Sequence, residues 1–167
     1  MNVEVNETLK QAFEQAGGGS VRFNEPMAEH TWLRLGGPAE IWAEPQSLRQ
    51  VKALLKVAAA HQVPVHWMGG GANLLVRDEG VSGLVLALFA PAFRTFEATD
   101  CEVRVGAGLP LERLLALTTK AGLSGCEFLA GVPGTVGGAI RMNAGTQDSS
   151  GNQRAMADVV DQITLLD

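Results

Sequence analysis

Three consecutive glycines open the segment Gly69-Gly70-Gly71-Ala72-Asn73-Leu74-Leu75-Val76, around which the chain is organised. An apolar run at 63–68 precedes them, and a second apolar run follows. Glycine lacks Cβ, so it reaches positive φ and lets a ligand approach the main chain closely. Successive exposed N–H groups form an anion-binding nest, whose usual guest is phosphate. The segment favours a phosphate-binding loop between two strands, in which Asn73 fixes the loop or adds a donor. A tight connection between two strands is the alternative.

A second glycine-dense segment lies at residues 122–139 and carries almost no charge. Flexible linkers are rich in Gly and Ser but lack Phe, Leu and Val at the density found here. We therefore expect a buried backbone that lines a ligand, with glycines where the ligand comes close. The alternative is a crowded crossing of strands.

Composition excludes several classes of function. The 167 residues are 46% hydrophobic, enough for one core in a single domain, or in a domain with a small additional lobe. A net charge of −5 without a basic cluster argues against a nucleic-acid surface. The sequence has no run of 18 apolar residues that could span a membrane, and its acidic N-terminus does not resemble a secretory signal. Cys101 and Cys126 fit no metal or redox spacing and are expected to be buried free thiols in a reducing cytoplasm.

The pattern of apolar residues predicts an alternation of strands and helices. The region 39–68 is a strand, a helix and a second strand, followed by the glycine loop, which makes a βαβ-like unit. Ser47 and Gln50 form the capping box of its helix, and Leu48, Val51, Leu54, Leu55 and Ala58 form its buried stripe. We expect helices at 8–16, 47–60 and 110–121, strands at 30–35, 39–43, 63–68, 84–88 and 159–166, a hairpin at 93–98 and 101–105, and a polar surface loop at 146–154.

Several known nucleotide-binding and catalytic motifs are absent from the sequence, and two residues, His66 and Arg34, need separate interpretation. Neither glycine cluster completes the Rossmann pattern, and Gly-Lys is absent, which excludes the Walker loop. With no Tyr and three scattered His, neither a metal site nor a Ser-His pair is expected. His66 is interpreted as an edge histidine. Arg34 is a cation on an otherwise apolar predicted strand, and it either pairs with a buried acid or reaches a cofactor.

Three segments, in the same order along the chain, resemble the UDP-N-acetylenolpyruvoylglucosamine reductase family of bacterial cell-wall synthesis, also called UDP-N-acetylmuramate dehydrogenases. They are residues 31–39, residues 69–76, and residues 122–145 with the centre Pro133-Gly134-Thr135-Val136-Gly137-Gly138-Ala139. The resemblance runs from about residue 20 to the end. Two departures are Ala72, where the family usually has Ser, and the segment 146–154, which is longer and different.

The resemblance implies an α+β fold, the FAD-binding domain of the vanillyl-alcohol-oxidase type, with a small N-terminal lobe and a larger mixed-sheet lobe. It implies an FAD-binding domain at 21–167, with lobes at about 21–76 and 77–167, which follows the N-terminal helix and linker that the residue pattern predicts at 1–20. The family's C-terminal substrate domain would be absent, so we expect a fragment or one domain of a longer reductase. Its catalytic residues are expected beyond Asp167, and none is assigned here.

The resemblance also implies FAD as cofactor and NADPH as reductant, with hydride passing from the flavin to the enolpyruvyl double bond of a UDP-sugar. This reaction belongs to peptidoglycan synthesis, and hence to cell shape and division. We expect a cytoplasmic monomer that binds neither nucleic acid nor membrane. A non-catalytic nucleotide-binding module and an oxidase of the same fold are the alternatives. The implied cofactor-binding residues are Met68, Gly69, Gly70, Gly71, Ala72, Asn73, Leu74, Ala130, Gly131, Val132, Pro133, Gly134, Thr135, Gly137, Gly138 and Ala139.

Overall fold

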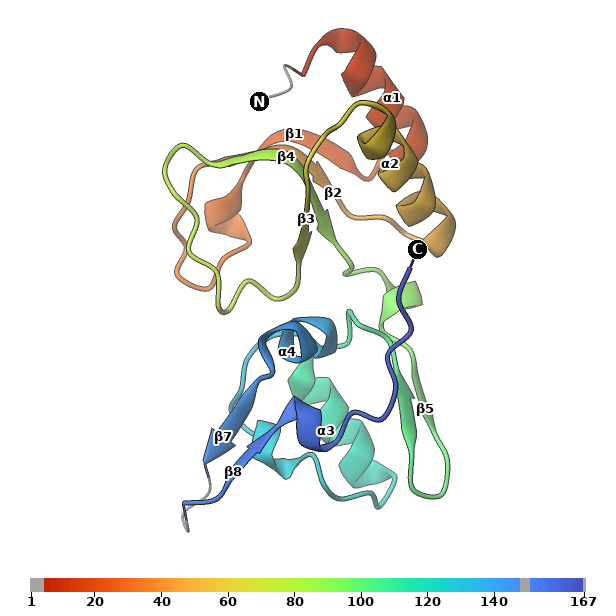
Figure 1. Cartoon of the computed structure of the whole chain (residues 1–167), viewed down its shortest axis with the longest axis vertical. Helices are drawn as coiled ribbons and strands as arrows, with labels where there is room; N and C mark the ends of the chain where they lie inside the picture. The colour runs from red at the N-terminus through yellow and green to blue at the C-terminus, as the bar shows by residue number, and fades with distance from the viewer. Residues whose placement is uncertain (1–4, 148–150, 167) are drawn as a thin grey trace. The chain divides into compact units, whose positions relative to one another are not determined.

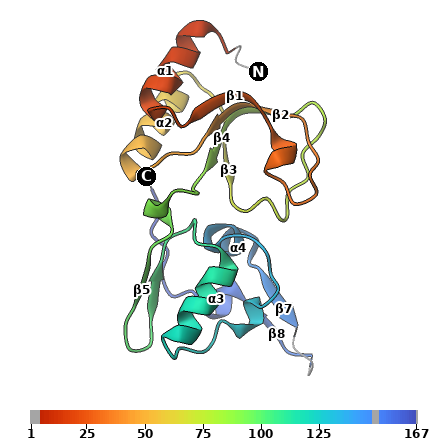
Figure 2. The ribbon, with the colours of Figure 1, turned by 180° about the vertical axis from the view of Figure 1, so that it is seen from behind.

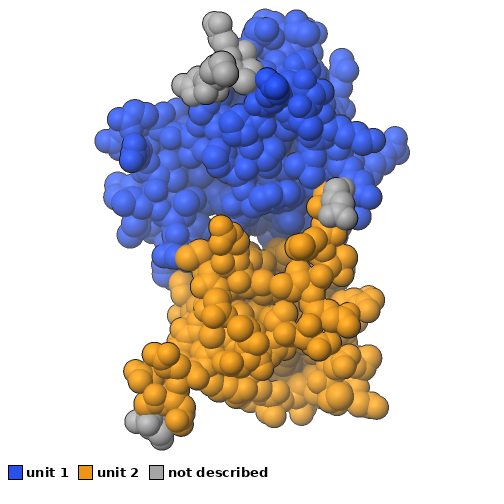
Figure 3. All heavy atoms as spheres, viewed as in Figure 1, with its two compact units in different colours: residues 1–94 blue, residues 95–167 orange. Residues whose placement is uncertain are grey.

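The computed structural model describes residues 5–147 and 151–166, and the chain divides into two compact units (Figures 1 and 3). Unit 1 comprises residues 1–94 and unit 2 comprises residues 95–167. The predicted boundary between lobes, near residue 76, differs from this division, because the strand at 81–87 lies inside the sheet of unit 1.

Unit 1 is built on a four-stranded mixed sheet in the order β1-β2-β4-β3. The strand β1 is antiparallel to β2, whereas β4 runs parallel to both of its neighbours. The predicted βαβ-like unit is therefore present, with β4 inserted between its two strands. The strands are β1 (Val21–Pro26), β2 (Pro38–Ala43), β3 (Val65–Met68) and β4 (Val81–Ala87).

Two helices, α1 (Glu7–Gly17) and α2 (Leu48–Ala60), cover one face of this sheet (Figures 1 and 2). Successive strand residues point to opposite faces, so the apolar side chains of each strand divide between two clusters. Ile41 and Leu84 join the cluster beneath the helices, with Phe13 and Leu54. The cluster on the opposite face contains Met27, Ala39, Trp42, Met68, Val76, Val85 and Ala87.

Capping residues explain where α1 begins and ends and where α2 begins. Asn6 Oδ1 accepts a hydrogen bond from the N–H of Leu9 at 3.0 Å, and Gly18 ends α1 in the left-handed conformation. Ser47 Oγ accepts from the N–H of Gln50, as predicted. The predicted capping box is incomplete, because the Gln50 side chain accepts from the N–H of Gln46 instead.

A bulge in β4 sets the register of β2 against β4. Ala39 pairs with Val81 and Ile41 pairs with Leu84, so two residues of β4 lie opposite one residue of β2. That residue is Glu40, whose carboxylate accepts from Ser82 Oγ at 3.0 Å and from the N–H of Gly83 at 2.7 Å. Glu40 therefore provides an acceptor for the N–H of Gly83 at the bulge.

Unit 2 has its own core between short elements, with Leu109, Leu111, Leu114, Leu129, Val136, Ala139 and Met156 buried. Gly122 follows the C-cap of α3, Ala121, in the C′ position that the sequence predicted, and it has a φ of +72°. The elements are α3 (Leu111–Lys120), α4 (Val136–Met142), the hairpins β5 (Phe96–Ala98) with β6 (Val103–Val105) and β7 (Gly145–Gln147) with β8 (Gln153–Ala155), and the short 3₁₀ helices η3 (Glu127–Leu129) and η4 (Met156–Asp158). Unit 1 has two more 3₁₀ helices, η1 (Met27–Glu29) and η2 (Pro91–Phe93).

Three predicted elements are wrong. Residues 30–35 form a turn rather than an extended strand, because the Thr31 hydroxyl both donates to and accepts from the backbone of Leu35. The predicted loop 146–154 contains the paired strands β7 and β8, although residues 148–150 lie outside the described residues. Residues 159–166 are not a strand, because no described strand pairs with them. In addition, Leu48 is exposed, although we placed it in the buried stripe.

Both cysteines are free thiols, but Cys101 is exposed, so its predicted burial is wrong. Burial raises the pKa of the Cys126 thiol, and the neighbouring Glu127 carboxylate raises it further. In the part of the chain that the structure describes, no helix is long and apolar enough to cross a membrane.

Candidate functional site

The glycine loop of unit 1 follows β3 and lies against a second loop, which connects η1 to β2 (Figures 1 and 2). The N–H of Trp32 donates to the carbonyl of Gly71 at 3.2 Å, and the N–H of Gly37 donates to the carbonyl of Arg77 at 2.8 Å. The two loops are therefore fastened to each other at both ends by their backbones. Residues 72–75 lie between these two hydrogen bonds.

The amides of the glycine loop are available to a ligand. Within the described residues, no N–H of the segment 69–74 donates a hydrogen bond. Gly71 is buried and its neighbours on both sides are half-buried, and buried N–H groups are almost always paired in native proteins. The side chain of Asn73 is exposed and makes no hydrogen bond in the described part of the chain. A run of unpaired amides matches the anion-binding nest that the sequence predicted.

Gly71 is required by the packing of the two loops. It is the one glycine of the three with a positive φ, +66°. A Cβ at this position would overlap the carbonyl oxygen of His30, and it would lie 2.9 Å from Cε of Met68. Close packing against the backbone of His30 therefore explains the glycine at 71. The alternative of a tight connection between two strands is wrong, because residues 69–80 separate β3 from β4. The unpaired amides of the loop are a separate observation that packing does not explain.

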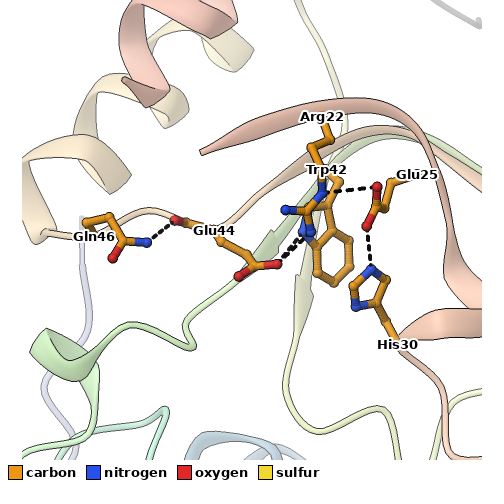
Figure 4. A network of polar contacts seen from close by, with 6 residues as sticks. All are labelled: Arg22, Glu25, His30, Trp42, Glu44 and Gln46. Carbon is orange, nitrogen blue, oxygen red and sulfur yellow. Dashed lines mark hydrogen bonds and ion pairs between the residues drawn. The ribbon is translucent and has the colours of Figure 1, made fainter. Parts of the chain in front are cut away.

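A polar network surrounds His30, where the second loop begins (Figure 4). Arg22 contacts Glu25 at 3.0 Å and Glu44 at 2.7 Å, and Nε1 of Trp42 donates to Glu44 at 2.9 Å. Burial by itself would raise the pKa of Glu44, but the hydrogen bonds from Trp42 and Arg22 outweigh it and lower that pKa. Burial would lower the pKa of Arg22, but the hydrogen bonds to Glu44 and Glu25 raise it.

His30 joins this network to the glycine loop. Its ring stacks on Trp42, with the ring centroids 3.9 Å apart and the planes 19° from parallel, and its Nε2 lies 2.8 Å from Glu25 Oε1. Sequence reasoning missed His30, Trp42 and Glu25. The available signal was the position of His30, directly before the motif at 31–39.

In unit 2, the backbone around 130–135 is also open to a ligand. Gly131 and Gly134 have φ angles of +81° and +118°, and nothing lies within 4 Å of the position that a Cβ would occupy at either residue. Within the described residues, the N–H groups of Gly131, Gly134 and Thr135 donate no hydrogen bond. Gly131 and Pro133 are exposed, so the prediction of a buried backbone is wrong here. The open amides fit a surface that faces a ligand.

The other predicted cofactor-binding residues of unit 2 already have partners within the protein. Gly137 donates to the carbonyl of Ala107 at 2.8 Å, and its own Cβ would lie 2.9 Å from Cβ of Ala107. Gly138 donates to Thr135 Oγ1 at 3.4 Å, and Ala139 is buried in the core. Gly137 is therefore explained by close packing against Ala107, although it lies in α4 and not at the crossing of strands that the alternative predicted. The N–H groups of Ala130 and Val132 are also paired within the fold, because they donate to the carbonyls of Glu127 and Leu129.

Arg34 does not pair with a buried acid. It is exposed, has a φ of +53°, and forms no ion pair with any described residue. The interpretation that it pairs with a buried acid is wrong, and its reach to a cofactor stays a prediction. His66 is exposed on β3 with Nε2 at 3.0 Å from the carbonyl of Ser82, as expected for an edge histidine.

Metal-binding side chains and a surface hollow also bear on the chemistry that the chain can support. Among the described residues, no three His, Cys, Asp or Glu side chains lie close enough together to hold a metal ion. Unit 2 has a polar hollow of about 340 Å³ beside the second hairpin, lined by Asn143, Gly145, Thr146, Gln147, Gln153, Arg154 and Ala155.

A family model described as an FAD binding domain matches residues 39–167. A UDP-N-acetylenolpyruvoylglucosamine reductase of Anoxybacillus flavithermus is 43% identical over 143 residues, which are 86% of this chain and 47% of that protein. The chain spans about half the length of the curated relatives that it matches.

Solved structures show the same similarity. The crystal structure of UDP-N-acetylenolpyruvylglucosamine reductase from Thermus caldophilus matches with a TM-score of 0.61 and 37% identity, covering 75% of this chain and 42% of that one. A p-cresol methylhydroxylase with substrate bound matches with a TM-score of 0.56 and 13% identity, covering 73% of this chain and 27% of that one, and shows the fold alone. The predicted α+β fold of the vanillyl-alcohol-oxidase type and the predicted resemblance are confirmed.

Proposed function

Because the chain belongs to the FAD binding domain family, we propose that it is the FAD-binding part of an NADPH-dependent reductase that converts UDP-N-acetylglucosamine enolpyruvate to UDP-N-acetylmuramate. The family membership and the relatives named above support this proposal. One observation of the structure carries it: the amides of residues 69–74 are unpaired in the described part of unit 1. A dinucleotide needs such a site for its diphosphate.

We propose that the loop 69–74 binds the diphosphate of FAD and that Met68 supports it from the core below. In unit 2, the N–H groups of Gly131, Gly134 and Thr135 are the ones available to FAD, with Ala130, Val132 and Pro133 forming the surface around them. Gly137, Gly138 and Ala139 fix the start of α4 rather than donate to the cofactor, because their N–H groups are already paired. That both segments bind the same FAD molecule stays a prediction.

The proposed reaction reduces the enolpyruvyl double bond by adding one hydride and one proton, and it oxidises NADPH to NADP⁺. When bound, FAD supplies the hydride-transfer chemistry between the two substrates, while the protein supplies binding and orientation. We propose that the catalytic residues lie beyond Asp167, outside this sequence. The role in peptidoglycan synthesis, with its effect on cell shape and division, follows from the same proposal. The free thiols of Cys101 and Cys126 fit the reducing cytoplasm, where we propose that the protein acts as a monomer.

The relatives named above favour this reductase over a stand-alone nucleotide-binding module, because they are reductases. The oxidase alternative has support only at the level of the fold, since the p-cresol methylhydroxylase is 13% identical.

The test is binding of FAD to the purified chain, measured by the quenching of flavin fluorescence and by co-elution of flavin absorbance in gel filtration. We expect a saturable complex of one FAD per chain, and we expect inorganic pyrophosphate to compete with FAD. A folded chain that neither co-elutes with FAD nor quenches its fluorescence would contradict the proposal. Binding that pyrophosphate does not weaken would move the diphosphate site away from residues 69–74.

A further inference from the structure

We infer that His30 is a positioning residue for the diphosphate loop, which it holds in shape through its backbone while its ring is anchored in the sheet. The inference rests on the proposed function, because it assigns a role in FAD binding to a residue outside the loop itself. Neither the motif segments nor the predicted cofactor-binding residues include His30.

The ring of His30 is fixed by two contacts (Figure 4). It stacks on Trp42, a residue of β2 that is fully buried, with the centroids 3.9 Å apart. It also makes a hydrogen bond of 2.8 Å to Glu25, which Arg22 contacts in turn. A carboxylate can only accept, so Nε2 carries the hydrogen and donates it. The ring therefore has one orientation, defined by β1 and β2.

The backbone of the same residue touches the glycine loop. The carbonyl oxygen of His30 occupies the space that a Cβ of Gly71 would need, so the two backbones are in van der Waals contact. Two residues further on, the N–H of Trp32 donates to the carbonyl of Gly71 at 3.2 Å. On the other side, the N–H of His30 donates to the carbonyl of Met27 at 2.9 Å. Gly71 is thus held by a segment that the ring of His30 anchors.

Affinity for FAD depends on this arrangement, because the loss of conformational entropy on ordering a loop weakens binding. The φ of +66° at Gly71 is part of the conformation that leaves the amides of residues 69–74 unpaired, and the contact with His30 constrains it. Without the imidazole ring, the segment 30–32 loses its attachment to Trp42 and Glu25. The diphosphate loop then samples other conformations, and FAD binds more weakly.

The experiment compares His30→Ala with His61→Ala, a matched change at an exposed histidine that caps the end of α2. The dissociation constant for FAD is measured by fluorescence quenching at a temperature where circular dichroism shows each variant folded. We expect His30→Ala to bind FAD about tenfold more weakly than the wild type and His61→Ala to bind it equally well.

Two conservative variants separate positioning from a general loss of structure. His30→Phe keeps an aromatic ring against Trp42 and should recover most of the affinity, whereas His30→Gln keeps only a donor for Glu25 and should recover part of it. The second readout is competition by inorganic pyrophosphate. If His30 acts through the diphosphate loop, His30→Ala weakens pyrophosphate binding by a factor close to that for FAD.

The outcomes are distinguishable. A wild-type chain that binds no FAD overturns the proposed function, and with it this inference. A wild-type chain that binds FAD, together with a folded His30→Ala that binds it equally well, overturns the inference alone. So does a loss of FAD affinity without any change in pyrophosphate competition. If His30→Ala does not fold, the same comparison is made between His30→Gln and His61→Gln, with unchanged FAD affinity in His30→Gln overturning the inference.

Discussion

At the scale of single residues, Gly71 combines two requirements for glycine, as Gly36, Gly80 and Gly83 also do. It has a positive φ, and the backbone of His30 lies against it. Gly122 has a similar φ of +72°, but nothing lies within 4 Å of its Cβ position. The comparison separates the cost of the conformation from the cost of the contact.

We predict that Gly71→Ala lowers the free energy of unfolding by about 3 kcal/mol or more, since the new methyl group has no room and the φ is unfavourable. Gly122→Ala should cost only about 1 kcal/mol, the price of a left-handed conformation for a residue with a side chain. Urea unfolding followed by circular dichroism measures both. Equal losses in the two variants would show that the contact with His30 contributes nothing.

Glu44 predicts a dependence of stability on pH. Its pKa is lowered from the ordinary value of 4.5, so the folded state binds the proton less readily than the unfolded state. The stabilisation is fully present above pH 4.5 and is lost as the pH falls through the lower, folded-state pKa. Because both Glu44 and Arg22 are partly exposed, we expect the contribution to be at most about 1 kcal/mol.

The measurement is urea unfolding of the wild type and of Glu44→Gln at pH 7 and at pH 3. We expect Glu44→Gln to be less stable at pH 7 and the difference to shrink at pH 3. A difference that is as large at pH 3 as at pH 7 would mean that the charge of Glu44 is not its cause.

The sequence drew attention to the glycine segments but did not give the structural reason for each glycine. Gly71 is required by its contact with His30, and Gly137 is required by its contact with Ala107. Each contact joins residues that are distant along the chain, so no local sequence pattern contains it. Gly131 and Gly134 are explained by their own positive φ angles. Local sequence does indicate a positive φ, because glycine adopts it without steric cost.

At the scale of elements, the bulge in β4 depends on the carboxylate of Glu40. The N–H of Gly83 is buried, and Glu40 is its acceptor. We predict that Glu40→Ala lowers the free energy of unfolding by about 1–3 kcal/mol, because a buried donor loses its partner. Glu79→Ala, at an exposed turn residue, should change it by no more than about 0.5 kcal/mol. Similar values for both, measured by urea unfolding, would contradict this role of Glu40.

The helices α1, α2 and α3 were predictable because their apolar residues repeat with the helical period and their ends carry caps, as at Ser47 and Gly122. The helix α4 was missed, because it lies in the glycine-dense segment that was interpreted as ligand-lining backbone. The strands were less so. The strand β1 was missed, since its alternate residues are only half-buried and Pro26 ends it. Residues 159–166 alternate in the sequence, but a strand also needs a neighbour, and the described residues offer none.

At the scale of the whole molecule, each unit has its own core, and the two cores share no residue. We predict that Leu54→Ala destabilises unit 1 and Leu129→Ala destabilises unit 2, each by about 2–5 kcal/mol, because both side chains are fully buried. Hydrogen exchange followed by mass spectrometry should show faster exchange mainly in the unit that carries the change. Equal acceleration in both units after either change would show that the chain unfolds as one cooperative body.

The order of strands in unit 1 has a consequence for synthesis on the ribosome. The strand β4 is the last of the four to be translated, yet it occupies an inner place between β2 and β3. Until residue 87 has left the exit tunnel, β2 and β3 have no common partner, and the edges that later pair with β4 are unpaired. A nascent chain paused before that residue is therefore the form most exposed to aggregation and most dependent on chaperones.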